Sequence, residues 1–306
     1  MKNFLSITDC STDRLKELLK ESGSLKKLYK SGSRDLCLSG KSLAMLFEKP
    51  SLRTRMSFQV AMTDLGGDAI YVKPEDIGGI GKREPVKDIA RVLSRYVHGI
   101  MARTFEHRTV TELAKFASVP VINALTDWSH PCQAMADMLT IEEHIGRLEG
   151  VKIAFIGDGN NVARSLAFAC AKLNMKMVIA TPAGYELDAE SVEKANQISA
   201  ETISRTNDPA QAVVDADIIY TDTWVSMGQE DEKQKRRADF ADFQVNSELL
   251  KSAPHAKIMH CLPAYRGLEV TDEVAESPDS IIFDQAENRL HFQRALLKKL
   301  LAQRMC

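Results

Sequence analysis

The segment Ser51-Leu52-Arg53-Thr54-Arg55 places a potential capping serine and two arginines within one turn. It directly follows an apolar run at residues 42–47, and Gly66-Gly67 lies downstream. Ser51 is therefore expected to cap a helix that ends near Gly66. The first backbone N–H groups of a helix carry partial positive charge, and with Arg53 and Arg55 beside them they would suit an anion such as phosphate. The simpler interpretation, a capped surface helix with solvated arginines, remains open at this point.

Three other polar clusters also follow apolar runs. They are His130-Pro131-Cys132-Gln133, Thr221-Asp222-Thr223-Trp224-Val225-Ser226-Met227-Gly228 and His260-Cys261-Leu262-Pro263-Ala264. In open α/β sheets, ligands bind outside the carboxyl ends of the strands, where these clusters are predicted to lie. Together with the arginine turn and with Asn160-Asn161, which follow a further apolar run, they offer cations for a phosphate, donors for a carbonyl, and a carboxylate with amides for an amino acid.

Repeated strand and helix patterns with short links predict an α/β protein. Short apolar runs indicate strands at residues 42–47, 69–72, 99–102, 119–123, 151–157, 177–180, 216–220, 256–259 and 280–283. We expect two domains, each a mainly parallel sheet flanked by helices, joined by linking helices, one of them at residues 131–145. The expected boundaries are 1–145 and 146–286, with a C-terminal helix at about 287–306 that packs back on the first domain.

Composition narrows the class of protein. The chain has 306 residues, enough for two domains, and a formal net charge of −2 with 27% charged residues. This balance argues against a nucleic-acid binder, and the absence of an 18-residue apolar run or a signal peptide argues against membrane insertion and secretion. Six scattered cysteines without a CxxC pair suggest neither a metal site nor a disulfide framework. A cytoplasmic protein with reduced thiols is expected.

Two further hypotheses arise from local patterns. The run from Gly157 to Val162 resembles a dinucleotide-binding fingerprint, but Val162 occupies the third glycine position and no acidic residue closes the next strand. Asn160 and Asn161 there would act as helix caps or grip the polar end of a substrate. Cys261 next to His260 suggests a thiol nucleophile, but adjacent residues on a strand point to opposite faces, so His260 is poorly placed to activate Cys261. His130 is the other candidate activator.

Taken together, the four motifs closely resemble those of the aspartate/ornithine carbamoyltransferase family, in the family's order and over essentially the whole chain. The arginine turn and His-Pro-x-Gln are common to the family, whereas Asp-x-x-x-Ser-Met-Gly and His-Cys-Leu-Pro belong to its ornithine branch. The resemblance implies transfer of the carbamoyl group of carbamoyl phosphate to L-ornithine, giving L-citrulline and phosphate in arginine biosynthesis. It also implies a homotrimer with active sites at subunit interfaces, and no metal or organic cofactor.

The resemblance assigns roles residue by residue. The residues implied at the carbamoyl phosphate site are Ser51, Leu52, Arg53, Thr54, Arg103, His130, Gln133, Cys261, Leu262 and Arg289. Those implied at the ornithine site are Asn161, Asp222, Ser226 and Met227. Arg103, His130 and Cys261 are the implied catalytic residues, with Cys261 and nearby Asp222 helping to deprotonate the attacking amine. A salt-bridged residue at a helix start is the alternative reading of Arg289.

The sequence departs from the family pattern at two places. Leu52 stands where threonine is common, a small loss if that residue contributes mainly its backbone N–H. Gly78-Gly79 stand where the family often places a glutamine or histidine that reaches the phosphate of a neighbouring subunit. Putrescine or N-acylated ornithine as acceptor, and a non-catalytic anion sensor, are the competing functions.

Overall fold

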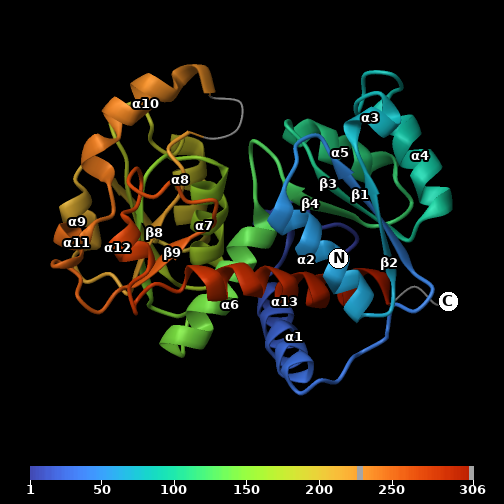
Figure 1. Ribbon diagram of the computed structural model, residues 1–306, viewed down its shortest axis with the longest axis horizontal. Helices are drawn as coiled ribbons and strands as arrows, with labels where there is room; N and C mark the ends of the chain where they lie inside the picture. Colours follow the sequence, from blue (N-terminus) through green and yellow to red (C-terminus); the bar gives the residue numbers. More distant parts are fainter. Residues whose placement is uncertain (226–229, 303–306) are drawn as a thin grey trace. The chain divides into compact units, whose positions relative to one another are not determined.

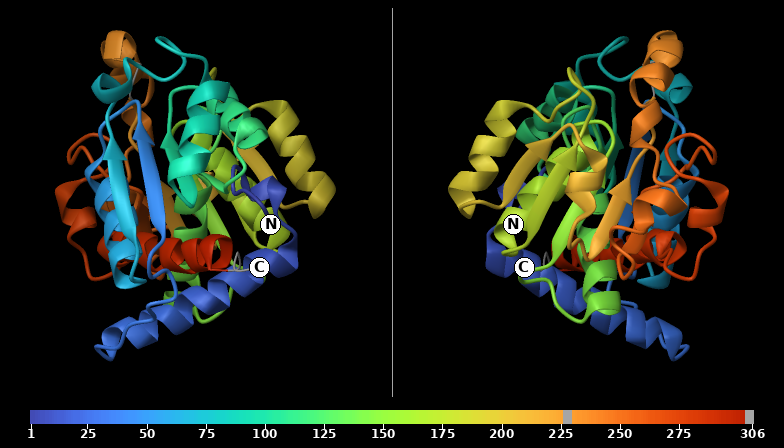
Figure 2. Two further views of the ribbon diagram at one scale, coloured as in Figure 1. Left: turned by 90° about the vertical axis from the view of Figure 1, so that its right-hand side faces the viewer. Right: turned by 90° about the vertical axis from the view of Figure 1, so that its left-hand side faces the viewer.

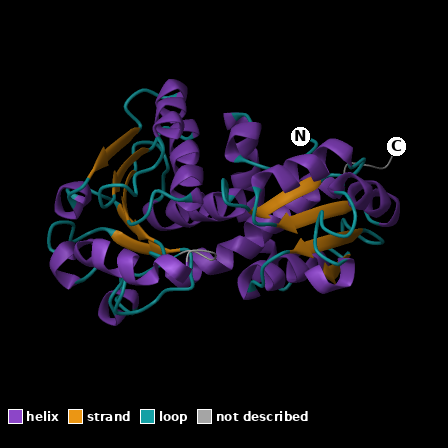
Figure 3. Ribbon diagram, turned by 90° about the horizontal axis from the view of Figure 1, so that it is seen from above, coloured by secondary structure: helices purple, strands orange, loops and turns teal. Residues whose placement is uncertain are grey.

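The computed structural model describes residues 1–225 and 230–302. The chain divides into two compact units, Met1–Leu139 with Glu287–Cys306 and Thr140–Ala286. Both contain a parallel sheet, and Figure 3 shows helices on both faces of each sheet. The predicted α/β class is confirmed. No helix in the described part of the chain is long and apolar enough to span a membrane.

The first unit is built on a four-stranded sheet of order β2-β1-β3-β4 (Figure 1). Its strands are β1 (Ser42–Phe47), β2 (Asp68–Val72), β3 (Gly99–Arg103) and β4 (Val121–Leu125). Its helices are α1 (Thr12–Lys30), α2 (Leu52–Asp64), α3 (Pro74–Ile77), α4 (Val86–Tyr96) and α5 (His107–Phe116), with parts of α6 (Pro131–Ile145) and α13 (Ile282–Leu301). β1 and β3 are almost wholly buried, as continuous apolar runs inside a parallel sheet should be.

The second unit has a five-stranded parallel sheet of order β7-β6-β5-β8-β9, and the right panel of Figure 2 faces it. Its strands are β5 (Lys152–Ile156), β6 (Lys176–Ala180), β7 (Ile203–Thr206), β8 (Ile218–Thr221) and β9 (Lys257–His260). Its helices are α7 (Asn161–Lys172), α8 (Ala189–Ile198), α9 (Pro209–Val213), α10 (Lys233–Asp239), α11 (Ser247–Leu250) and α12 (Asp272–Ala275). The apolar side chains of β5, β8 and β9 join those of the surrounding helices and loops in one core.

Two elements differ from the sequence-based expectation. The strand predicted at residues 280–283 is wrong: Ser280 forms only an isolated bridge to Ile258, and α13 begins at Ile282, earlier than the expected 287. A short apolar run does not distinguish a strand from the first turn of a helix. Strand β7 was not predicted, because only Ile203 of its four residues is buried and the others are polar.

Candidate active site

In the first unit, the arginine turn forms the capped helix start that its sequence predicts. Ser51 is the N-cap of α2, with extended backbone, and its Oγ accepts the backbone N–H of Thr54 at 3.3 Å. No acidic side chain occupies the first turn of α2 to neutralise its N-terminal partial charge. The Leu52 side chain is 73% exposed, so this residue offers the turn its backbone rather than its side chain.

Two buried guanidinium groups converge on one hydroxyl. Arg103 at the end of β3 and Arg289 on α13 donate to Thr54 Oγ1 at 3.5 and 3.4 Å. The Ser51 hydroxyl donates to the same oxygen at 3.1 Å. Thr54, Arg103 and Arg289 are each at most 6% exposed. Two cations withdrawn from water around one oxygen concentrate positive potential, which an anionic ligand would relieve.

The side chains of Arg53 and Arg55 lie in different surroundings, contrary to the expectation that both flank one anion. Arg53 is half-buried and close enough to influence the titration of His130 electrostatically. Arg55 is exposed, and its guanidinium lies over the ring of Tyr71, 4.2 Å from the ring centroid. That geometry is a cation–π contact on the surface, so only Arg53 adds its charge to the cluster.

Helix α6 contributes the next two polar groups. His130 comes directly before α6, and Pro131 begins the helix, where its missing N–H is tolerated. Gln133 lies in the first turn and is 1% exposed. Its Oε1 accepts from Arg289 Nη1 at 2.7 Å, and its Nε2 donates to Asp137 Oδ1 at 2.8 Å. Asp137 was not predicted as part of the site, because a four-residue spacing on a helix shows only that two side chains share a face.

The imidazole of His130 is held neutral. Burial is the main cause that moves its pKa well below the ordinary 6.5, and the charges of Arg289, Arg103 and Arg53 add to the effect. At neutral pH the ring therefore acts as an uncharged hydrogen-bond donor or acceptor. Cys132, the next cysteine along the chain, has its thiol pKa raised by burial to about 12, so it is not a thiolate nucleophile.

This shift predicts a pH-dependent stability. Below pH 6.5, residue 130 binds a proton in the unfolded chain but not in the folded protein. The free energy of unfolding therefore decreases as pH falls, by up to about 1.4 kcal/mol per pH unit. Urea unfolding between pH 7.5 and 5.5 should show a smaller loss for His130→Asn than for the wild type. Parallel losses in the two proteins would contradict the assignment of a depressed pKa to this histidine.

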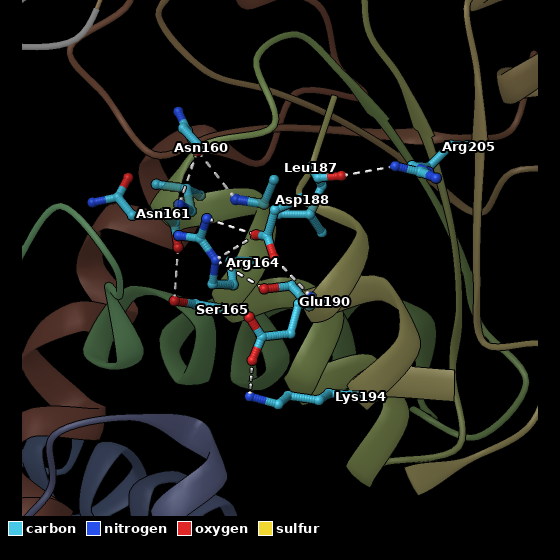
Figure 4. A network of polar contacts seen from close by, with 12 residues as sticks. Asn160, Asn161, Arg164, Ser165, Leu187, Asp188, Glu190, Lys194 and Arg205 are labelled. Carbon is cyan, nitrogen blue, oxygen red and sulfur yellow. Dashed lines mark hydrogen bonds and ion pairs between the residues drawn. The ribbon is translucent and has the colours of Figure 1, made fainter. Parts of the chain in front are cut away.

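In the second unit, the start of α7 is held by a capping asparagine. Asn160 Oδ1 accepts the backbone N–H groups of Val162 and Ala163 at 2.8 and 3.2 Å (Figure 4). The predicted cap is confirmed. Its Nδ2 donates to Asp222 Oδ2 at 2.9 Å, a link that sequence spacing does not reveal. Asn161 begins α7, is half-buried, and its backbone oxygen accepts the Ser165 hydroxyl at 2.8 Å.

The same region excludes the dinucleotide hypothesis. A side chain at Gly159 would meet the backbone nitrogen of Leu187 at 2.1 Å. Gly159 therefore allows the backbone at Leu187 to approach closely. In a dinucleotide-binding fingerprint, the glycine allows a pyrophosphate to approach instead.

The Asp222 carboxylate, at the end of β8, accepts three hydrogen bonds. Its Oδ1 accepts the Thr223 N–H at 2.8 Å and the Cys261 thiol at 2.9 Å, while its Oδ2 accepts from Asn160. The carboxylate is 5% exposed. Asp222 and Cys261 are thus brought together from two neighbouring strands, as expected. Ser226 and Met227, the other predicted members of this half, lie outside the described residues.

The His260 imidazole accepts a backbone hydrogen bond and does not contact the Cys261 thiol. Its Nδ1 accepts the Leu262 N–H at 2.8 Å, and its Nε2 lies 3.2 Å from Glu269 Oε1. The Cys261 thiol instead points to Asp222, which confirms that His260 does not activate it. Asp222, His260 and Cys261 place ligand-type atoms within 4.8 Å of one another. Both imidazole nitrogens are already engaged, so this grouping is better explained by hydrogen bonding than as a metal centre.

The loop after α3 contains two consecutive glycines with left-handed backbone. Gly78 and Gly79 have φ values of +68° and +86°, which strongly favour glycine. A side chain at Gly79 would also lie 2.9 Å from Lys82 Cδ. The loop therefore presents backbone groups at this point.

Both halves of the chain match family models. Residues 2–143 match the carbamoyl-P binding domain of aspartate/ornithine carbamoyltransferase, and residues 149–300 match its Asp/Orn binding domain. The chain belongs to the aspartate/ornithine carbamoyltransferase family. This finding confirms the resemblance that the four motifs indicated.

Individual relatives point to the ornithine branch. The chain is 54% identical over 301 residues to the ornithine carbamoyltransferase of Methanosarcina mazei, covering 98% of this chain and 99% of the relative. The anabolic ornithine carbamoyltransferase of Pyrococcus furiosus is 51% identical, covering 97% and 95% of the two chains. A solved structure of ornithine carbamoyltransferase from Pyrococcus furiosus matches with a TM-score of 0.96 at 49% identity, covering 99% of this chain and 98% of the other.

Proposed function

We propose that this protein transfers the carbamoyl group of carbamoyl phosphate to the side-chain amine of L-ornithine, giving L-citrulline and phosphate for arginine biosynthesis. The observation that carries the proposal is the Asp222–Cys261 contact at 2.9 Å, formed by the two motifs of the ornithine branch. The relatives named ornithine carbamoyltransferase at more than half identity support it.

The first unit is suited to carbamoyl phosphate. Ser51, the Leu52 backbone, Arg53 and Thr54 hold the phosphate, and Arg289 adds a second guanidinium. Attack on the carbamoyl carbon builds negative charge on its oxygen, and Arg103 with the neutral His130 stabilises that charge. Gln133 orients the carbamoyl group. The cation cluster also stabilises the departing phosphate, so catalysis rests on positioning and electrostatics.

The second unit is suited to an amino acid with a side-chain amine. Asn161, Asp222, Ser226 and Met227 hold the α-amino and α-carboxylate groups, and Cys261 and Leu262 lie toward the reacting end. An alkylammonium has a pKa of about 10.4, and only its neutral form attacks. Cys261, held by the Asp222 carboxylate, positions that amine and helps to remove its proton.

An acceptor panel tests the substrate assignment. We expect carbamoylation of ornithine to exceed that of acetylornithine, putrescine and aspartate by at least about 100-fold in kcat/KM, because each lacks a group that the site pairs: a free α-amine, an α-carboxylate or a side-chain amine. Colorimetric and chromatographic assays of each product check this. Preferential turnover of any of the other three would contradict the assignment.

The assembly and its location complete the proposal. Family membership suggests a homotrimer with shared active sites, and sedimentation of the purified protein tests the oligomeric state. None of the described cysteines forms a disulfide, which suits a reducing compartment, and we infer a cytoplasmic enzyme.

A further inference from the structure

Asp137 lies behind the carbamoyl phosphate site, one helical turn after Gln133 on the same face of α6. Its side chain is fully buried. Burying a carboxylate is unfavourable unless it is paired or hydrogen-bonded, so its position calls for an explanation. Its contact with Gln133 Nε2 at 2.8 Å supplies one.

The two neighbours of Gln133 permit only one orientation of its amide. Asp137 Oδ1 accepts from the NH₂ group of Gln133 at 2.8 Å, and a carboxylate oxygen without a proton can only accept. A guanidinium only donates, so Arg289 at 2.7 Å requires the carbonyl oxygen. A reversed amide would place two donors against each other at Arg289 and two acceptors against each other at Asp137.

We propose that Asp137 is a positioning residue that makes Gln133 a hydrogen-bond acceptor toward the substrate and so selects the NH₂ of a carbamoyl group over the CH₃ of an acetyl group. The inference rests on the proposed function. When bound phosphate forms hydrogen bonds with Arg289, the contact between Arg289 and Gln133 Oε1 no longer fixes the orientation of the Gln133 amide by itself. Asp137 then keeps the Gln133 oxygen facing the substrate.

The first test compares two substitutions at residue 137. Asp137→Leu removes the acceptor, whereas Asp137→Asn keeps one oxygen that can accept from Gln133. The readout is the ratio of the inhibition constant of acetyl phosphate to the KM of carbamoyl phosphate, with ornithine saturating. Asp137→Leu should lower this ratio at least about tenfold, as expected for one hydrogen bond with a charged partner. Asp137→Asn should stay within about threefold of the wild type.

The second test exchanges the two side chains. Gln133→Glu places two carboxylates in contact and should lower kcat/KM for carbamoyl phosphate about 100-fold. In the double variant Gln133→Glu/Asp137→Asn, the new amide NH₂ donates to the new carboxylate, whose other oxygen again accepts from Arg289. At least about tenfold of the lost kcat/KM should then be recovered. This pair introduces no apolar residue and tests the proposal even where Asp137→Leu does not fold.

The outcomes separate the inference from the proposed function. An unchanged ratio in folded Asp137→Leu, equal losses in the leucine and asparagine variants, or an exchanged pair no better than Gln133→Glu would overturn the role of Asp137. A wild-type protein that forms no citrulline would overturn the proposed function instead.

Discussion

Arg53→Ala is expected to raise the KM for carbamoyl phosphate at least about 100-fold while leaving the KM for ornithine within about threefold. Hydrogen bonds to charged groups contribute about 1.5–3 kcal/mol each, and a guanidinium offers two to a phosphate. Arg53 stands in the first turn of α2, where the helix N-terminus adds its partial charge. Initial-rate kinetics with each substrate varied in turn measure both constants.

Arg55→Ala provides the matched control. It removes the same charge from the same turn, but the exposed Arg55 has its guanidinium over the half-buried ring of Tyr71. We expect less than about a threefold change in the KM for carbamoyl phosphate. Equal effects of the two substitutions would mean that general positive potential, and not a specific contact of Arg53, binds the phosphate.

Asp222→Asn is expected to lower kcat/KM for ornithine about 100- to 1000-fold. The substitution removes the negative charge that we propose pairs with the substrate's ammonium group, and it sets an NH₂ against donors from Asn160, Thr223 or Cys261. Losing one partner of a buried charge pair costs about 2–5 kcal/mol. Isothermal titration should show carbamoyl phosphate binding within about threefold of the wild type.

Asp188→Asn is the control for this second substitution. Asp188 caps α8 by accepting the Ser191 N–H at 2.8 Å and pairs with Arg164 (Figure 4). Asparagine still caps a helix, so we expect a loss of about 1 kcal/mol or less in unfolding free energy and no change in ornithine kinetics. A kinetic loss as large as that of Asp222→Asn would show that any charge change in this unit impairs catalysis.

The sequence predicted eight of the nine strands in the described residues and the strand ends that carry the candidate site. Apolar runs such as residues 42–47 and 151–157 are continuous and bounded by turn residues, so the sequence predicts them as buried strands. Strand β7 was missed because it is short, polar and at the sheet edge, where pairing with β6 and not its own pattern makes it a strand.

The types of the motif residues indicate their chemistry, but the residues that contact them were not predicted. Asn160, Asp137 and Glu269 act through side-chain contacts that span 62, 4 and 9 positions along the chain. The contacts of Asn160 and Glu269 depend on the finished fold, and one sequence carries no local signal for them. Gln133 and Asp137 have the i,i+4 spacing of one helix face, but that spacing alone does not show that the two side chains pair. The different surroundings of Arg53 and Arg55 likewise depend on the fold, because Tyr71 on the neighbouring strand β2 lies under the Arg55 guanidinium.

Direct measurement of both products tests the central claim. Purified wild-type protein, supplied with carbamoyl phosphate labelled at its carbon and with ornithine, should form labelled citrulline and phosphate in equal amounts, followed by NMR. Release of phosphate without labelled citrulline would contradict carbamoyl transfer and indicate hydrolysis of carbamoyl phosphate. Binding of carbamoyl phosphate without any turnover would contradict it and favour an anion-binding sensor.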